Sequence, residues 1–365
     1  MPNNYTLYGT SFSLYTGKAR AYLRYKNVPY EEVFSSLKVY KRIIVPNTGV
    51  RFIPVVKTPE GQYIQDTAAI IDTIEAQHPQ CPVYPTTPKQ RIVSQLFELY
   101  GDEWLLLPAM HYRWNKDNDD YIYGHFGSVV LPEWPAFIRR FVGKKVGSKF
   151  KGFVPLLGIT DKTIPALEQW YENELLPLLD AHFAKYNYLL GSAASVGDFG
   201  LMGPLYAHLY LDPYPRQLIK AKAPHVEAWI NRMNQTPTEV GDWVADDAIP
   251  DTLIPILKLL FRDHWPVIQS TLSTFSLWSA QNPGASVPRM AGKHAFKIDG
   301  VEGSRAVTTF TVWKYQRILD TFIGLNEEKQ TQVNAFLNAC GADEPFDNPP
   351  FPRVKRENNR LVMDE

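Results

Sequence analysis

The sequence is poor in cysteine and lacks a net charge, a long apolar run and any metal-binding spacing of histidine. Its two cysteines, Cys81 and Cys340, cannot build a disulfide framework, which favours a reducing, cytoplasmic location. The 38 basic and 38 acidic residues cancel, which argues against nucleic acid or an anionic membrane as the main partner. No apolar run approaches the roughly 20 residues of a membrane span, and the first residues lack the layout of a signal peptide. We therefore expect a cytoplasmic protein that binds no metal.

The composition that is present is typical of a large globular chain. The 365 residues are enough for two or three domains, and 45% of them are hydrophobic. The 9 Trp, 20 Tyr and 19 Phe suit an aromatic-lined pocket and equally a large aromatic core. Four prolines between Gln77 and Pro88 indicate a stiff linker, so we place a domain boundary there.

The N-terminal segment alternates between strand and helix patterns. Tyr5–Tyr8 and Tyr30–Phe34 are rich in strand formers, and Leu14–Tyr25 between them has helical spacing. This order predicts two parallel strands joined by a helix. The basic side chains expected on the polar side of that helix are Lys18, Arg20 and Arg24.

The stretch from Gly49 to Glu75 organises the rest of the segment. A β-branched run is interrupted by Pro54, and a Pro-Glu-Gly turn at 59–61 lets the chain fold back. Asp66 and Thr67 then open an apolar run with helical spacing. The stretch therefore predicts a β-hairpin followed by a helix.

Both ends of this hairpin suit a small extended anion. A cis bond between Ile53 and Pro54 would let the backbone of Ile53 point out of the sheet toward a ligand. Asp66 and Thr67 stand where a helix begins, and the N–H groups there attract a carboxylate. Thr67 adds a hydroxyl donor. A plain hairpin followed by a capped helix explains the same residues without a ligand.

The pattern resembles the glutathione-binding half of the glutathione transferase family. In that family a strand enters a cis-proline, and an acidic or amide residue, a serine and an Ala-Ile pair follow the hairpin. Ile53-Pro54 and Asp66-Thr67-Ala68-Ala69-Ile70 match it, with Thr in place of Ser and Asp in place of Glu or Gln. The resemblance implies a thioredoxin-like βαβ-ββα domain with glutathione as co-substrate, bound by Ile53, Pro54, Asp66 and Thr67.

The start of the first helix adds a second mark. Many members of the family carry a Ser or Cys there, five residues before a Lys or Arg, and counting back from Lys18 gives Ser13. Ser11 is the runner-up. Tyrosine-type members would need Tyr where this chain has Phe12, and reductase-type members would need Cys. A simple helix cap is the structural alternative for Ser13. Weaker hydroxyl candidates are Tyr8 and Tyr15.

The resemblance also implies which residues bind the glycyl carboxylate of glutathione and which line the pocket for the second substrate. Lys41 and Arg51 are the expected cations for the glycyl carboxylate, although ordinary surface cations explain them too. A helix from about Lys89 to Trp114 would line the pocket for the electrophilic substrate. The pocket candidates are Phe12, Tyr15, Tyr100, Trp104, His111 and Trp114.

The second half of the resemblance is helical. Thr163–Tyr186 and Pro224–Thr236 have amphipathic spacing, and Ser195 with Asp198 forms a capping box typical of the family's second domain. Residues 115–160 have weak periodicity and are interpreted as a long excursion or lid. The resemblance covers about residues 5–236.

The remaining residues lie outside the family pattern. Helices are expected over 249–278, 311–322 and 326–339, a short strand over 294–301, and an extended tail from Asp343. The predicted fold is an α/β thioredoxin-like domain at 1–80, an all-α domain at 88–240 and a mostly helical extension at 241–365.

Our leading hypothesis is a cytoplasmic, homodimeric glutathione transferase of the serine type. Ser13 would stabilise the thiolate of glutathione for attack on a hydrophobic or aromatic electrophile. The alternatives are a dehalogenase, an ether-cleaving enzyme or an isomerase that uses glutathione, and a non-catalytic interaction protein with the same fold. Neither a nucleic acid nor a membrane is expected as a partner.

Overall fold

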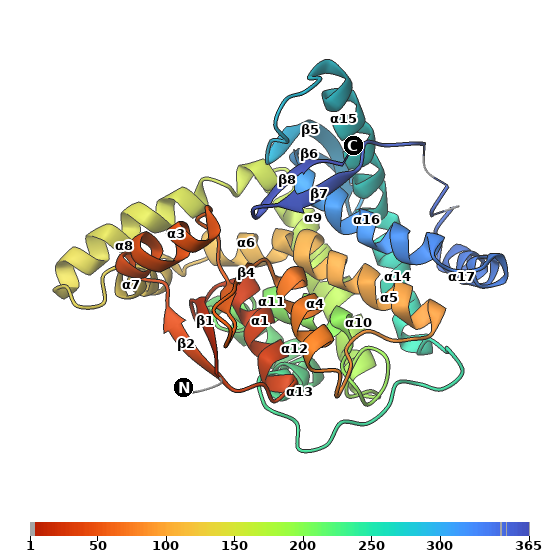
Figure 1. Cartoon of the computed structure of the whole chain (residues 1–365), viewed down its shortest axis with the longest axis horizontal. Coiled ribbons are helices and arrows are strands. Elements are labelled where there is room, and N and C mark those ends of the chain that lie inside the picture. The colour runs from red at the N-terminus through yellow and green to blue at the C-terminus, as the bar shows by residue number, and fades with distance from the viewer. Residues whose placement is uncertain (1–3, 344, 348, 365) are drawn as a thin grey trace. The chain divides into compact units, whose positions relative to one another are not determined.

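The computed structural model describes residues 4–343, 345–347 and 349–364. Its contacts divide the chain into two compact units (Figure 1). Unit 1 comprises Met1–Val83, Pro108–Val154 and Phe199–Val240, and unit 2 comprises Tyr84–Leu107, Pro155–Asp198 and Gly241–Glu365. The division into domains at 1–80, 88–240 and 241–365 stays a prediction.

Unit 1 contains a four-stranded sheet in the order β2-β1-β3-β4. The first pair, β1 and β2, is parallel, and the other two pairs are antiparallel. Helices α1 and α4 pack against each other. This βαβ-ββα arrangement confirms the predicted thioredoxin-like fold. The elements are β1 (Tyr5–Gly9), α1 (Leu14–Tyr25), β2 (Tyr30–Phe34), α2 (Leu37–Val39), a π-helical segment (Tyr40–Ile44), α3 (Val45–Thr48), β3 (Val55–Lys57), β4 (Tyr63–Gln65) and α4 (Thr67–Gln77).

The prediction that Lys18, Arg20 and Arg24 lie on the exposed, polar side of α1 is wrong for the first two. Lys18 and Arg20 are buried, with 0% and 4% of their surface exposed. The guanidinium of Arg20 donates to both carboxylate oxygens of Glu32 on β2, at 2.8 and 2.6 Å. A helix pattern records which residues are apolar, so it cannot reveal a cation whose partner lies on another element.

The long excursion or lid predicted over 115–160 contains two helices that its weak periodicity did not predict, α7 and α8, and they form an antiparallel pair. Their backbones approach at glycines: a Cβ on Gly127 would lie 2.1 Å from the carbonyl oxygen of Arg139, and one on Gly143 would lie 2.0 Å from that of Tyr123. Helices that pack through glycine need no apolar stripe, which explains the weak periodicity. The helices of unit 1 beyond the sheet are α6 (Leu106–Trp114, from Pro108 on), α7 (Asp119–Val130), α8 (Ala136–Lys151), α11 (Val196–Ala207, from Phe199 on), α12 (Pro213–Lys222) and α13 (Pro224–Met233).

Unit 2 is mostly helical and contains two β-hairpins. Three of its helices pass through a π-helical segment, at Tyr100–Trp104, Trp170–Leu175 and Leu260–His264. Its other elements are α5 (Pro88–Leu99), a 3-10 turn (Pro155–Leu157), α9 (Ile164–Gln169), α10 (Leu176–Phe183), a 3-10 turn (Asp251–Leu253), α14 (Ile254–Leu259), α15 (Trp265–Gln281), β5 (Met290–Ile298), β6 (Val301–Thr308), α16 (Thr309–Ile323), α17 (Glu327–Ala339), β7 (Val354–Glu357) and β8 (Arg360–Met363).

The predictions for the C-terminal extension are correct for the helices and incomplete for the strands. The expected short strand is one arm of the hairpin β5–β6, which turns at Asp299-Gly300. The tail expected to be extended contains the hairpin β7–β8, which turns at Asn358 and Asn359 with positive φ angles. Asparagine tolerates that conformation, so the Asn-Asn pair was the available signal for this hairpin.

The predicted capping box is present in unit 2. A carboxylate oxygen of Asp198 accepts hydrogen bonds from the Ser195 backbone N–H at 2.8 Å and from its hydroxyl at 3.0 Å. The second oxygen accepts from the backbone N–H of Leu189 at 2.9 Å. Because Ser195 and Asp198 are fully buried, this carboxylate serves folding and not chemistry.

No described helix combines the length and apolar character required to cross a membrane.

A buried histidine in unit 2 predicts a loss of stability in acid. His182 of α10 lies 2.7 Å from the Thr252 hydroxyl and 3.2 Å from the Tyr188 carbonyl oxygen. Burial lowers its pKa to about 4, although the Tyr188 carbonyl opposes the shift. Between pH ~6.5 and 4, His182 is protonated in the unfolded chain and neutral in the folded chain. Stability from this group is therefore complete above pH ~6.5 and falls by up to about 3 kcal/mol as the pH drops to 4.

Denaturant unfolding of the wild type and His182→Gln, near neutral pH and in mild acid, measures this contribution. Glutamine keeps hydrogen-bonding groups and does not titrate, so the variant should lose less stability in acid than the wild type. An equal loss in both proteins would show that His182 does not carry the effect.

Candidate functional site

The register of the sheet in unit 1 brings three predicted segments to one end. Tyr8 of β1 faces Val55 of β3, and Val55 faces Gln65 of β4. These are the last pairs of both antiparallel registers at this end of the sheet, so the residues just after Tyr8, just before Val55 and just after Gln65 lie at the same end. The loop before α1, the Ile53-Pro54 junction and the N-terminus of α4 therefore meet at the same edge.

The loop after β1 carries both candidate serines. Ser13 is half-buried and caps α1, with its hydroxyl oxygen accepting from the Thr16 backbone N–H at 3.4 Å. Ser11 lies in the preceding turn and is also half-buried, and Phe12 between them is buried. The cap bond uses the Ser13 oxygen as the acceptor, so it leaves the hydroxyl hydrogen available to donate to a ligand.

Two buried arginines hold this loop in place by donating hydrogen bonds to its backbone carbonyl oxygens. Arg20 donates to the carbonyl oxygen of Thr10 at 3.2 Å. Arg113 of α6 donates to the carbonyl oxygen of Phe12 at 2.9 Å and to both oxygens of buried Asp212, at 2.7 and 2.9 Å. Burial raises the pKa of Asp212, and the Arg113 guanidinium opposes that shift.

Nothing local in the sequence marks Arg113 for this role, because its partners lie about a hundred residues away on both sides. It stands between the predicted candidates His111 and Trp114, where charge next to aromatics was the only available signal.

The hairpin end of the site has the predicted backbone. The Ile53-Pro54 bond is cis, and Asp66 adopts a φ of 81° just before α4. The Asp66 carboxylate accepts from the backbone N–H groups of Ala68 at 2.8 Å and Ala69 at 3.4 Å. Two first-turn donors are therefore already engaged by Asp66.

Thr67 is the remaining donor at this helix end. Its side chain is 2% exposed, and its hydroxyl makes no hydrogen bond to any other residue in the described part of the chain. A carboxylate arriving here would thus meet the N–H and hydroxyl of Thr67 beside the side chain of Asp66.

The two predicted cations are exposed. Lys41 lies in the π-helical segment Tyr40–Ile44, and Arg51 lies two residues before Ile53. Chain connectivity places Arg51 within reach of the Ile53 end of the site. The role of both cations stays a prediction.

The predicted pocket residues divide between the two units. In unit 1, His111 and Trp114 are buried, with 1% and 2% exposed, and Tyr15 is half-buried. In unit 2, Tyr100 and Trp104 are fully buried, and Trp104 stacks on His264 at 5.3 Å. Pocket membership of these residues, and of Phe12, stays a prediction.

Helix α7 supplies two neighbours of Phe12 that the sequence reasoning missed. The Phe126 ring meets Phe12 edge to face at 4.9 Å, and the His125 ring does so at 5.8 Å. Phe126 also stacks on Trp114 at 6.2 Å. Both were missed because the weak periodicity of residues 115–160 did not predict a helix there.

Neither a metal site nor a cysteine site is seen beside the serines. Among residues 4–343, 345–347 and 349–364, no group of three or more His, Cys, Asp or Glu side chains could hold a metal ion. Cys81 is half-buried and Cys340 is buried, and both are free cysteines.

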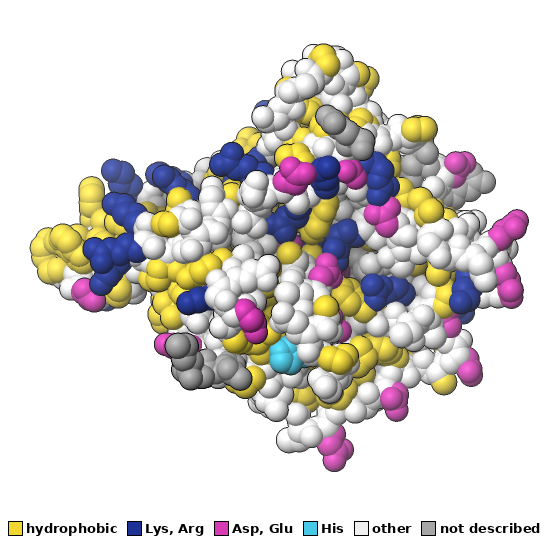
Figure 2. Space-filling view, viewed as in Figure 1, with side chains coloured by type: hydrophobic (Ala, Val, Ile, Leu, Met, Phe, Trp, Pro, Cys, Tyr) yellow, Lys and Arg dark blue, Asp and Glu magenta, His cyan; other side chains and the backbone are white. Residues whose placement is uncertain are grey.

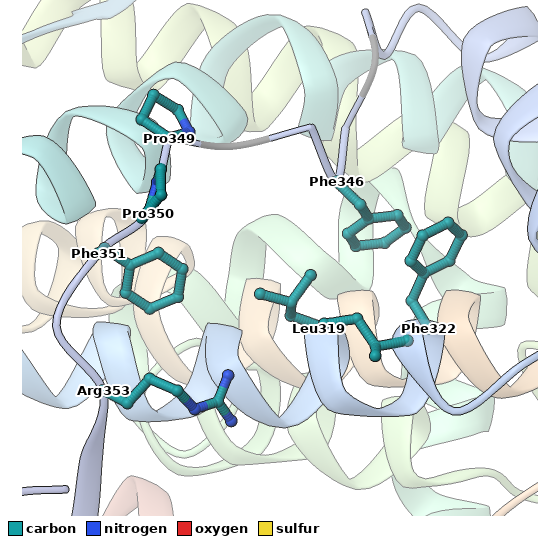
Figure 3. A pocket seen from close by; sticks show the side chains of 8 residues that line it. Leu319, Phe322, Phe346, Pro349, Pro350, Phe351 and Arg353 are labelled. Atoms are coloured by element: carbon teal, nitrogen blue, oxygen red, sulfur yellow. The ribbon is translucent and has the colours of Figure 1, made fainter. Parts of the chain in front are cut away.

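A separate pocket of about 270 Å³ lies in the C-terminal part of unit 2 (Figure 3). Its walls are mainly aromatic and proline side chains, and the rings of Phe322 and Phe346 stack at 4.2 Å. Its one charged wall residue, Arg353, pairs with Asp320. The lining residues are Leu319, Phe322, Ile323, Phe346, Pro349, Pro350, Phe351 and Arg353.

The fold and the segments at its sheet edge define a thioredoxin-like domain, which is followed by an all-helical stretch from Pro88 to Met233. Comparison with family profiles then identifies the family. The family profile of the glutathione S-transferase N-terminal domain matches residues 7–82, and that of the glutathione S-transferase C-terminal domain matches residues 156–237. These two segments of the chain therefore belong to the glutathione S-transferase family.

Comparison with curated protein sequences gives no significant match. Among solved structures, a tau-class glutathione S-transferase from the mango Mangifera indica is 18% identical, with a TM-score of 0.39, and the match covers 69% of this chain and 93% of that chain. A glutathione S-transferase from Methylobacterium radiotolerans in complex with glutathione sulfonate is 17% identical, with a TM-score of 0.37 and coverage of 67% and 100%. A β-etherase from Sphingobium is 15% identical, with a TM-score of 0.41 and coverage of 64% and 96%. The family assignment rests on the two profiles.

Proposed function

We propose that this protein is a glutathione transferase of the serine type. Glutathione lies along the sheet edge, with its backbone against Ile53 and a carboxylate at the N-terminus of α4. Ser13 donates its hydroxyl hydrogen to the sulfur, and the thiolate attacks a hydrophobic or aromatic electrophile. The observation that carries this proposal is the register that collects the loop of Ser13, the Ile53-Pro54 junction and Thr67 at one end of the sheet.

A hydrogen bond from Ser13 is strong enough to keep the thiol of bound glutathione largely ionised at neutral pH. A free thiol titrates near pH ~8.5, so little thiolate forms at neutral pH. A hydrogen bond to a charged group contributes about 1.5–3 kcal/mol, which lowers a thiol pKa by roughly one to two units. The N-terminus of α1 adds about 0.3–1 kcal/mol in the same direction. The serine stabilises the nucleophile and does not attack itself.

Tyr8 is a poorer candidate for this role than the serines. Its side chain is 6% exposed and packs in a cluster with Ile44 and Val55. Burial, and then the neighbouring Tyr63, raise its pKa. Tyr8 therefore serves the core of the sheet.

Calorimetric titration with glutathione tests the binding site. The wild type should bind saturably, and Thr67→Ala should weaken binding roughly 10- to 150-fold if its hydroxyl contacts the carboxylate. Thr73→Ala is the matched control, because Thr73 lies on the same helix and its hydroxyl bonds the Ala69 carbonyl oxygen at 2.8 Å. This control should leave the affinity unchanged.

Absence of glutathione binding by the wild type would reduce Ser13, Asp66 and Thr67 to helix caps and favour a non-catalytic interaction protein. Where binding is found, product analysis separates the reactions by what is released and by whether glutathione is retained. Dehalogenation releases a halide, ether cleavage releases an alcohol or phenol, and isomerisation returns free glutathione. We also infer a homodimer, as is typical of the family, and a cytoplasmic location in keeping with the two free cysteines.

A further inference from the structure

We propose that the tip of the α7–α8 hairpin binds the surface of an anionic lipid bilayer. This inference does not rest on the proposed glutathione chemistry. Its starting point is a set of large apolar side chains that face solvent: Trp134 is 53% exposed, Phe137 75% and Phe141 71%. Figure 2 shows apolar and basic side chains gathered over this hairpin, at the left of the view.

The glycine packing of the hairpin explains this exposure. With Gly127 and Gly143 at the contact between α7 and α8, the two backbones touch and leave no space for large side chains there. Phe137 and Phe141 are one helical turn apart and therefore share one face of α8. Exposed aromatic clusters of this kind mark interaction sites.

The charges behind the tip indicate an anionic partner. Residues 136–151 of α8 contain six basic residues and no acidic one. The whole hairpin, residues 119–151, adds three acidic residues to these six basic ones, so its net charge is +3. Asp120 pairs with Arg140 at 2.7 Å and Asp119 pairs with Lys151 at 3.3 Å. Lys144 and Lys145 are exposed in the middle of the helix.

The order of apolar and basic residues favours a bilayer. Residues 131–138 form an apolar tip in which Glu133 is the one charged residue. Arg139 and Arg140 follow directly, with Arg140 paired to Asp120, and the exposed Lys144 and Lys145 lie about 10–12 Å beyond Phe137 along the helix axis. A bilayer interface has the same two zones, since acyl chains begin about 5–10 Å below the charged headgroups. Tryptophan at the tip suits that boundary.

Other occupants fit this order less well. Nucleic acid would require unpaired, exposed cations between the aromatic side chains. Here Arg140, between Phe137 and Phe141, pairs with Asp120, and Arg139 is half-buried. A second copy docked through the same face would bring Lys144 and Lys145 of both chains together. The zero net charge of the chain, which argued against an anionic membrane, averages over this local excess of positive charge.

Vesicle flotation of the full-length protein tests the proposal. The wild type should partition onto vesicles of equal parts phosphatidylcholine and phosphatidylserine, far less onto pure phosphatidylcholine, and less at high salt. The double variant Phe137→Ser/Phe141→Ser should lower the partition coefficient at least tenfold, because two apolar side chains no longer insert. Lys144→Gln/Lys145→Gln should lower it about ten- to thirtyfold on anionic vesicles alone.

Leu277→Ser is the matched control, because Leu277 is 64% exposed on α15, outside the hairpin. It should partition like the wild type, while Glu133→Gln should bind more tightly. Failure of the wild type to bind anionic vesicles would overturn the proposal, as would equal binding to both lipid compositions or an equal loss in the Leu277 control. Wild-type affinity for duplex DNA that depends on the lysines, or a dimer dissociated by the phenylalanine variant, with vesicle binding unchanged in either case, would assign the surface to those occupants instead.

Discussion

Replacing Ser13 by alanine is expected to lower turnover roughly 10- to 150-fold while glutathione still binds. The loss follows from removing one hydrogen bond to the thiolate, which raises the thiol pKa of bound glutathione by about one to two units. Ultraviolet absorbance of the thiolate, titrated against pH, measures that pKa without an electrophile. Initial rates with a general aromatic electrophile such as chlorodinitrobenzene measure the turnover.

The matched control is Ser11→Ala, two residues away in the same loop, which should leave both measurements unchanged. Ser13 also caps α1, so its removal should cost about 1 kcal/mol of stability, and unfolding curves separate this effect from the chemistry. If Ser11→Ala raises the thiol pKa and Ser13→Ala does not, the runner-up takes the role. An unchanged pKa in both variants would remove the serine mechanism.

Replacing Lys314 by methionine is expected to destabilise the protein by about 3–5 kcal/mol. The Lys314 ammonium on α16 lies 2.7 Å from a carboxylate oxygen of Asp102 and 3.3 Å from one of Glu98. All three side chains are at most 5% exposed. Methionine would leave two carboxylates buried without their cation, at a desolvation cost that water cannot relieve.

Urea unfolding measures this difference in the free energy of unfolding. The control is Lys297→Met, since Lys297 and Glu302 form an exposed pair and exposed pairs contribute at most about 1 kcal/mol. Adding Glu98→Gln and Asp102→Asn to Lys314→Met should recover much of the lost stability, because the uncompensated charges are gone. A Lys314→Met protein as stable as the Lys297 variant would refute the buried-charge account.

Local signals predicted the fold well because the deciding residues are neighbours in sequence. Pro54, the turn at 59–61 and Asp66-Thr67 fix a hairpin and a helix start within about fifteen residues, and each behaves as its chemistry requires. The capping box of Ser195 and Asp198 spans four residues and was equally predictable from the sequence.

Long-range partners were the part that the sequence could not predict. The ion pairs of Arg20 with Glu32, Arg113 with Asp212 and Lys314 with Asp102 each join different elements, so no spacing rule identifies them. The α7–α8 pair was hidden for a different reason: glycine contacts replace the apolar stripe that marks most helices. Of the candidate site, the backbone frame was predictable, and the guanidinium groups that hold the Ser13 loop were not.

The π-helical segments of unit 2 have a consequence for how chains of this kind change in length. A π turn contains one residue more than an α turn, so each segment stores a single-residue insertion inside a helix, without a loop. All three of these segments meet around Trp104, which stacks on His264 of one π segment and meets Trp170 of the other edge to face at 6.2 Å. Losing one residue within a π segment would restore an α turn and keep the following side chains on their faces, whereas losing one from a regular α turn would rotate them by about 100° around the helix axis. Gaps between related sequences at these places therefore preserve the phase of the helix, and the positions on either side can be aligned as one helix.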